Sequence, residues 1–252
     1  MNKLFTPRWL MRHAVVLLVF ILLVNFGFWQ LRRLEQKRMR NSDILAALSQ
    51  DPAILTGETP VDPDALHFSP VRATGTFDNQ AAMFLRNRDF EGLSGVHLLT
   101  PLRIRGSDQT VLVDRGWIPR GNTDLTPAEL AAYDQSGEVT VTGIAYRSQP
   151  QPEGWLVPRD PPLQAGQERL VGWFRVNINR IQEQLPYPLL PIYIEQTPDQ
   201  AEPAFDSFPR QAGSVSLDEG PHLGYAIQWF SFAAILLVTY GYFIQQELRG
   251  KQ

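Results

Sequence analysis

The sequence predicts a membrane protein in which two transmembrane helices flank a mostly-β (α+β) domain. Two observations carry this prediction. An uncharged apolar stretch of membrane-spanning length lies near each end of the 252-residue chain. The region between them is a series of short runs rich in β-branched and aromatic residues, separated by Gly and Pro. We expect its strands to form an antiparallel sandwich or a partly open barrel.

The first apolar stretch, Ala14–Leu31, has no charged residue and would be about 27 Å long as a helix, close to the hydrocarbon thickness of a bilayer. Basic residues precede it, as they do in a cleaved signal peptide, but such a peptide needs small residues after its apolar run. Here the run ends in Phe28 and Trp29 and continues into Arg32 and Arg33. We therefore expect an uncleaved anchor.

The second apolar stretch, Leu223–Ile244, is also uncharged and long enough to span. Tyr225 and Trp229 lie near one end and Tyr240 and Tyr242 near the other, which is typical of the two membrane interfaces. The alternative is a buried core helix, but such a helix would not need to be apolar on every side. Two spans place both termini on the same side of the membrane. Five basic residues lie at the terminal ends of the spans and five at the inner end of the first span, so charge does not indicate which side the termini are on.

Between the spans, Arg32–Leu48 contains good helix formers without Gly or Pro and predicts a helical stalk, whereas Asp51–Pro63 has the composition of a linker. Gly106-Ser107-Asp108 is typical of a hairpin connection. The runs predicted to be strands are Val71–Phe77, Ala81–Asn87, Gly95–Ile104, Thr110–Trp117, Glu138–Tyr146, Arg169–Val176 and Leu190–Gln196.

Short helices are predicted at two places in the same region. Thr126 and Glu129 form a capping-box pattern with Pro127 at the first helical position, so a helix should run to about Tyr133. Asn179–Leu185 has a second, weaker helical pattern. The Pro-rich segments Pro150–Pro162 and Pro198–Pro209 are expected to be long loops, whose role is open.

Composition excludes several functions. Residues 41–221 carry thirteen Arg, no Lys and twenty-four acids, a net charge of −11, which disfavours nucleic-acid binding. The absence of Cys excludes disulfides, thiolate zinc sites, iron–sulfur clusters and covalent C-x-x-C-H haem attachment. Only four Met occur, so a Met-rich copper site is not expected.

Catalytic signatures are also missing from the sequence, which contains no P-loop, no dinucleotide-binding glycine motif and no His-Glu-x-x-His. Ser94 and His97 are close enough along the chain to suggest a hydrolase pair. On a strand, however, positions 94 and 97 point to opposite faces. We therefore predict that the protein is not an enzyme.

The most distinctive candidate site residue is His222, at the start of the second span. In a helix, Tyr225 and Trp229 follow it at i+3 and i+7 on the same face. A neutral imidazole nitrogen could bind the iron of a haem, and the aromatic rings could contact the apolar macrocycle. The alternative is an ordinary histidine in an aromatic interface belt.

Three amide side chains lie within the spans: Asn25 and Gln30 in the first and Gln228 in the second. Polar amides in membrane helices commonly hydrogen-bond between helices. They could hold the two helices of this chain together, or they could dock another membrane protein, and the sequence leaves both alternatives open.

Several ordered motifs resemble the surfeit locus protein 1 family, the membrane assembly factors of cytochrome c oxidase. The resemblance runs almost from end to end, and the order and spacing of the motifs make it specific. The matching segments are Gly27–Arg33 with Lys37, Gly75–Asp78, Leu85–Arg88, Gly92, Gly95–His97, Thr100–Leu102, Val111–Pro119, Tyr193–Glu195 and His222–Phe230. We expect Arg115, Gly116 and Trp117 to shape the domain, since Gly within a strand often marks a bulge.

The resemblance implies a location in the plasma membrane of a bacterium or in the mitochondrial inner membrane. It implies that 1–13 and 245–252 are cytoplasmic (or face the mitochondrial matrix), that 14–31 and 223–244 span the membrane, and that 32–222 form an extracytoplasmic domain with its stalk. It also implies transient binding of haem a, with His222 as the metal ligand, and haem delivery to the catalytic subunit of the oxidase.

Two functions remain open at this point. The first is a chaperone that holds or delivers haem a, with the catalytic subunit and possibly haem a synthase as partners. The second is a scaffold that stabilises an oxidase assembly intermediate without binding haem. A colourless protein that still co-purifies with the oxidase subunit would favour the second.

Overall fold

The computed structural model describes residues 3–58, 60–120, 124–154, 157–163, 169–198, 208–211 and 215–249. The chain divides into two compact units. The helical unit contains Met1–Asp43 and Ser216–Gln252, and the β unit contains Ile44–Val215.

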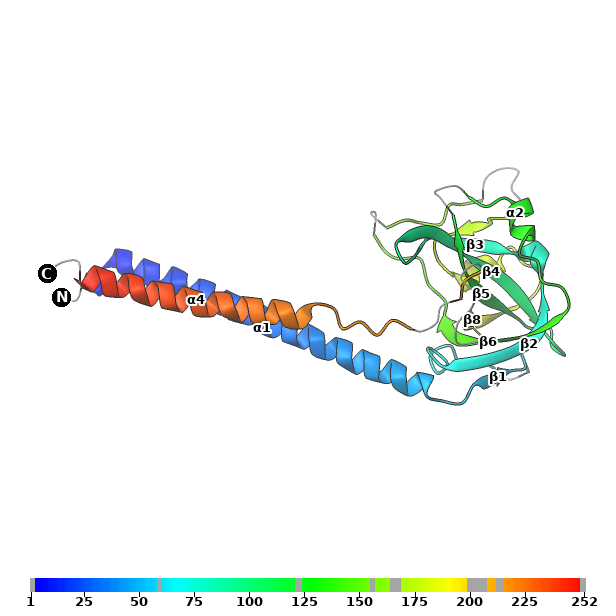
Figure 1. Ribbon diagram of the computed structural model, residues 1–252, viewed down its shortest axis with the longest axis horizontal. Coiled ribbons are helices and arrows are strands. Elements are labelled where there is room, and N and C mark those ends of the chain that lie inside the picture. Colours follow the sequence, from blue (N-terminus) through cyan, green and yellow to red (C-terminus); the bar gives the residue numbers. More distant parts are fainter. Residues whose placement is uncertain are drawn as a thin grey trace. The chain divides into compact units, whose positions relative to one another are not determined.

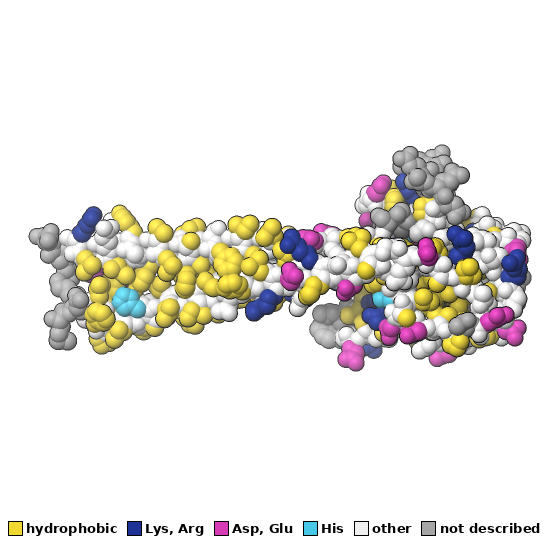
Figure 2. Space-filling model, turned by 90° about the horizontal axis from the view of Figure 1, so that it is seen from below, with side chains coloured by type: hydrophobic (Ala, Val, Ile, Leu, Met, Phe, Trp, Pro, Cys, Tyr) yellow, Lys and Arg dark blue, Asp and Glu magenta, His cyan; other side chains and the backbone are white. Residues whose placement is uncertain are grey.

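Two long helices make up most of the helical unit: α1, Pro7–Leu48, and α4, His222–Arg249, with a short 3-10 turn η1, Lys3–Phe5, before α1. They contain both predicted spans, and α1 also contains the predicted stalk. Only 11% of the most apolar stretch of α1 and 6% of that of α4 is buried, so neither is the core helix of a water-soluble fold. Figure 2 shows hydrophobic side chains exposed along this unit. Both helices have the length and composition of membrane spans.

The two helices pack antiparallel along their length. Near one end the rings of Trp9 and Phe243 are 5.7 Å apart, and further along α1 the rings of Phe26 and Trp229 are 5.0 Å apart. At Gly27 the helices approach so closely that a Cβ atom would lie 2.6 Å from the ring of Phe230. Small residues at such contacts allow membrane helices to pack tightly.

The β unit contains the strands and the shorter helices that the structure describes (Figure 1). The strands are β1 Ala53–Leu55, β2 Pro70–Phe77, β3 Met83–Phe90, β4 Leu93–Ile104, β5 Thr110–Pro119, β6 Glu138–Arg147, β7 Gly172–Trp173 and β8 Leu189–Gln196. The helices are η2 Asn79–Ala81, α2 Pro127–Ala131 and α3 Ile178–Gln182.

Five of these strands close into a barrel. The sheet order is β1-β2-β6-β8-β5-β4-β3-β7, and an additional antiparallel pairing of β2 with β4 joins the ring β2-β4-β5-β8-β6. Within the ring β5 and β8 are parallel and the other neighbours are antiparallel. This Greek-key order is that of the OB-fold. Of the two predicted architectures, the barrel is therefore the one that forms.

Separate apolar cores fill the barrel and cover its outer face. The interior core contains Val71, Leu102, Val113, Val141 and Ile194, each at most 1% exposed. Because side chains alternate along a strand, Leu112 points outward into a second core with Leu85, Trp173, Ile181 and Tyr193. The strands β3 and β7 and the helix α3 supply the outer part of this second core.

The structure corrects several predicted boundaries. Only Gly172–Trp173 of the predicted strand Arg169–Val176 pairs as β7, beside Phe84 and Leu85 of β3. After Trp173 the chain leaves the sheet and enters α3 at Ile178. The predicted linker Asp51–Pro63 contains the edge strand β1, which pairs with β2. Ala81 lies in η2 and not in a strand. The helices α2 and α3 are shorter than predicted, and α2 has the predicted capping box.

Gly116 and its neighbours shape β5 as predicted. Leu98 pairs with Gly116 but Leu99 pairs with Asp114, so Arg115 is the extra residue of a β-bulge. The backbone at Gly116 has φ +120°, and a Cβ there would lie 2.4 Å from the carbonyl oxygen of Arg210. Only Gly fits this position.

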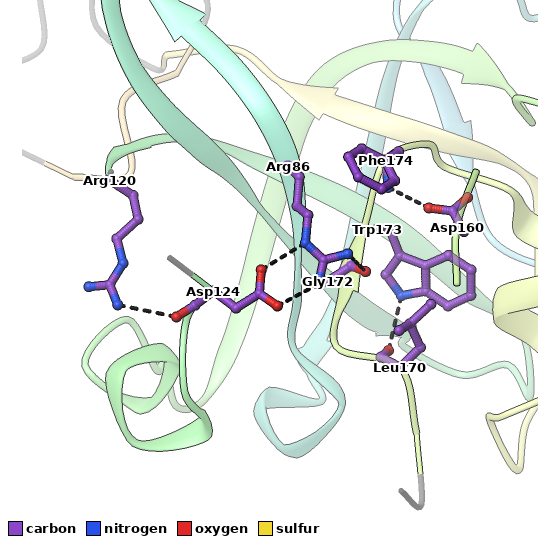
Figure 3. Close-up of polar contacts among 8 residues, drawn as sticks. All are labelled: Arg86, Arg120, Asp124, Asp160, Leu170, Gly172, Trp173 and Phe174. Carbon is purple, nitrogen blue, oxygen red and sulfur yellow. Dashed lines mark hydrogen bonds and ion pairs between the residues drawn. The ribbon is translucent and has the colours of Figure 1, made fainter. Parts of the chain in front are cut away.

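Arg86, on β3 and within one of the matching motifs, hydrogen-bonds to two other segments of the β unit (Figure 3). Its guanidinium donates to both carboxylate oxygens of Asp124, at 2.7 and 2.6 Å, and to the carbonyl oxygen of Gly172 at 2.6 Å. In the Pro150–Pro162 loop, Asp160 accepts a hydrogen bond from the amide of Phe174 at 2.5 Å. This described part of the loop therefore fixes the segment around β7. Residues 155–156, and 199–207 of the second predicted loop, lie outside the described residues.

Candidate functional site

His222 is the first residue of α4 and contacts the partner helix through a polar bond. Its Nδ1 lies 2.8 Å from Oε1 of Gln30 on α1. Gln30 is only 9% exposed, and His222 is half-buried. Because Gln30 is almost completely buried, this bond fixes the orientation of its amide and of the imidazole that it contacts.

The bond to Gln30 determines which imidazole nitrogen is available. An amide oxygen only accepts hydrogen bonds, so Nδ1 of His222 carries the hydrogen and donates it to Gln30. The lone pair of the neutral ring is then on Nε2. In metal sites a histidine ligand is oriented in the same way, by a hydrogen bond from its other nitrogen.

Gly220 lies beside the imidazole ring. A Cβ atom at Gly220 would lie 3.5 Å from both Cδ2 and Nε2 of His222. On this side the ring therefore faces the backbone of Gly220 and no bulky side chain. The donor chemistry fits haem iron, because the Nε2 lone pair is not used by the bond to Gln30.

Tyr225 and Trp229 differ in how much of the side chain is exposed and in how it packs. Tyr225 is 48% exposed and available to a ligand on the surface of α4. Trp229 packs against Phe26 of α1 and also against Phe232, with ring centroids 5.0 and 6.1 Å apart. The structure therefore places Trp229 mainly in helix packing.

The other amides in the spans have different roles. Asn25 donates to the carbonyl oxygen of Ile21 within α1 at 2.8 Å, and Gln228 is exposed on α4. Of the three amides, Gln30 is the one that hydrogen-bonds between the described parts of the two helices. In the sequence, Gln30 and His222 lie far apart and nothing pairs them. The missed signal was that both lie at the same end of their spans, which an antiparallel pair brings together.

The possible hydrolase pair is not assembled. Nδ1 of His97 lies 2.8 Å from Oδ2 of Asp114, and His97 lines a cavity with Tyr193 and Glu195. Ser94 lines a different cavity with Arg86 and Arg120. The two side chains therefore point to opposite faces of β4, as predicted.

These features define a class: a membrane protein with two apolar helices, a small β-barrel domain and a histidine oriented between the helices. The sequence model of the SURF1 family matches residues 17–234, and the chain belongs to the SURF1 family.

Individual relatives agree with this assignment. A SURF1-like protein of Monosiga brevicollis is 27% identical over 89% of this chain and 84% of its own length. One of Rickettsia felis is 27% identical over 90% of this chain and 94% of its own length. An uncharacterised SURF1-like protein of Mycobacterium tuberculosis is 27% identical over 99% of this chain and 88% of its own. Membership of the family implies a role in cytochrome c oxidase assembly.

Proposed function

We propose that the protein holds haem a transiently and delivers it to the catalytic subunit of cytochrome c oxidase at the extracytoplasmic face of the membrane. Haem a synthase, as the source of the haem, is a further proposed partner. His222 would bind the iron through Nε2, Tyr225 would contact the macrocycle, and Trp229 would support the site through its packing with Phe26.

The observation that carries this proposal is the hydrogen bond from His222 to Gln30. It holds the imidazole in one tautomer and one orientation before any ligand arrives. An ordinary interface histidine would not need a buried acceptor such as Gln30. When bound, haem supplies the iron and the redox chemistry of the oxidase, and this chain supplies orientation and a route for transfer.

A single imidazole on a membrane surface suits temporary binding. Among the described residues no group of three or more His, Asp or Glu side chains lies close enough to bind a metal together. Haem held through one protein ligand and apolar contact can pass to a site with more ligands, because the acceptor then binds it more tightly.

The test uses the full chain, co-expressed with haem a synthesis and purified in detergent. Wild type should show a Soret band, and His222→Ala should lose it while the circular dichroism spectrum is unchanged. His13→Ala is the matched control. His13 lies in α1 just before the first predicted span, and both of its nitrogens have partners, the Tyr240 hydroxyl at 2.7 Å and the Leu4 carbonyl at 3.2 Å.

Two outcomes would contradict the proposal. A Soret band of equal strength in His222→Ala would show that haem binds elsewhere. A colourless wild-type protein that still co-purifies with the catalytic subunit would favour the scaffold function, in which the helices and the β unit stabilise an assembly intermediate without haem.

A further inference from the structure

The β unit contains a polar cavity that the proposed haem site does not use. It has a volume of about 370 Å³ and lies on the outer face of the barrel, where β3, β4, β5 and β8 meet the segments around Gln149 and Phe174. Small-molecule sites in proteins typically have volumes of about 300–1,000 Å³. The cavity is therefore large enough for a small organic molecule.

Its position in the fold is that of a ligand site. OB-fold proteins bind ligands on the face of their second and third barrel strands, between the loops that follow the first and fourth. Here those strands are β4 and β5, which contribute His97 and Asp114. The two loops contribute Arg88, on β3, and Arg175, just after β7. This is an analogy of position, and the ligand must be inferred from the side chains themselves.

The cavity contains two acids, Asp114 and Glu195. Both oxygens of Asp114 already have partners, and burial disfavours the charged form of Glu195. Asp114 accepts from the Gly116 amide at 3.1 Å through one oxygen and lies 2.8 Å from Nδ1 of His97 through the other. Burial, and then the nearby charge of Asp114, raise the pKa of Glu195 above its ordinary value. The charges of His97 and Arg88 act in the opposite direction on the pKa of Glu195, but less strongly than burial does.

The guanidinium groups of Arg88 and Arg175, by contrast, have N–H groups that are not fully used in hydrogen bonds. The Nε of Arg175 is buried without a hydrogen-bond partner. Arg88 makes one long bond, 3.4 Å, to the carbonyl oxygen of Phe174. A guanidinium has five N–H donors and matches the geometry of carboxylate and phosphate groups. The unused hydrogen-bonding capacity of the cavity is thus mainly that of cationic donors.

The segment that carries Arg175 is held in place by the contacts in Figure 3. Arg86 donates to the carbonyl oxygen of Gly172, and Asp160 accepts from the amide of Phe174. A site wall fixed on both sides is pre-organised, so little conformational entropy is lost when a ligand binds.

We propose that this cavity binds a small organic anion, whose carboxylate or phosphate group is held by Arg88 and Arg175. Glu195, Tyr193 and His97 lie on the strands of the same cavity and would contact the polar remainder of the molecule. Leu85 and Phe174 supply its apolar wall. The proposal is independent of haem binding, because every residue it uses belongs to the β unit.

Calorimetric titration of the full chain in detergent with succinate and, separately, inorganic phosphate tests it. Binding of either is expected, and the tighter of the two identifies the group recognised. Arg175→Gln and Arg88→Gln should each weaken that binding about tenfold or more, since each removes a charged hydrogen-bond donor. His222→Ala should bind as wild type does.

Arg147→Gln is the matched control for loss of charge, because Arg147 is exposed and pairs with Asp64 at 2.8 Å away from the cavity. It should leave the affinity unchanged. Glu195→Gln should bind at least as tightly as wild type, and this variant keeps the test decisive if an arginine variant fails to fold. No binding of either anion, or equal weakening by Arg147→Gln, would overturn the proposal.

Discussion

At the scale of single residues, the most informative contact is the hydrogen bond between Gln30 and His222. Gln30→Leu keeps the size and apolar surroundings of the side chain but removes the acceptor for Nδ1. Loss of such an orienting partner typically weakens metal binding by about 10–100-fold. We therefore expect haem occupancy to fall in Gln30→Leu, measured from the Soret absorbance per chain. Gln228→Leu, an exposed amide lost from α4, should not change it, and equal loss in both variants would contradict the orienting role.

Gly116 gives a residue-scale prediction about stability. Gly116→Ala introduces a side chain at φ +120° and against the carbonyl oxygen of Arg210, so it should destabilise the β unit by about 2–4 kcal/mol. Gly106→Ala, at φ +76° in open space, should cost only about 1 kcal/mol. Urea denaturation of the two variants in detergent provides the measurement. Equal costs would show that the close approach to Arg210 contributes nothing.

At the scale of elements, helix α2 is stabilised at its N-terminus by Glu129. The Thr126 backbone amide, then its hydroxyl, then Arg120 lower the pKa of Glu129 to about 2. Because this pKa lies below the ordinary value of 4.5, the stabilisation is present above pH 4.5 and is lost as the pH falls toward 2. Gln at this position can still accept from Thr126 but carries no charge.

Thermal unfolding of wild type and Glu129→Gln across this pH range tests the assignment. Wild type should unfold at the higher temperature at pH 6, and the difference should shrink steadily to nothing near pH 2. A difference that stays constant over the whole range would mean that the charge of Glu129 has no part in capping α2.

At the scale of the whole molecule, the arrangement of the chain across the membrane can be tested directly. The chain has no Cys, so one introduced Cys is a unique label. Asp108→Cys, in the exposed turn between β4 and β5, should react with a membrane-impermeant maleimide in intact spheroplasts. Gln245→Cys, after the second predicted span, should react only after permeabilisation. The reverse pattern would invert the predicted orientation, and release of the chain by an alkaline carbonate wash would exclude two spans.

Much of the secondary structure could be predicted because it depends on local properties. The apolar stretches Ala14–Leu31 and Leu223–Ile244 lie inside α1 and α4, and the capping box predicted the start of α2. The prediction was wrong at β7, where the run Arg169–Val176 has strand-forming residues but only Gly172–Trp173 finds a partner, and at β1, which pairs from within a linker-like segment. Strand pairing depends on a distant partner, which composition does not reveal.

For the candidate site, sequence by itself identified His222 and its aromatic neighbours, because an imidazole at the end of an apolar span is unusual in its own right. The two membrane helices and the mostly-β domain also followed from sequence, since hydrophobicity and strand propensity are properties of short segments. Only the tertiary structure decided that Gln30 orients His222, that Trp229 packs against Phe26, that β2 and β4 close the barrel, and that Arg88 and Arg175 border one cavity. Each of these depends on contacts between segments far apart in the chain, and their geometry is set by how the whole fold packs.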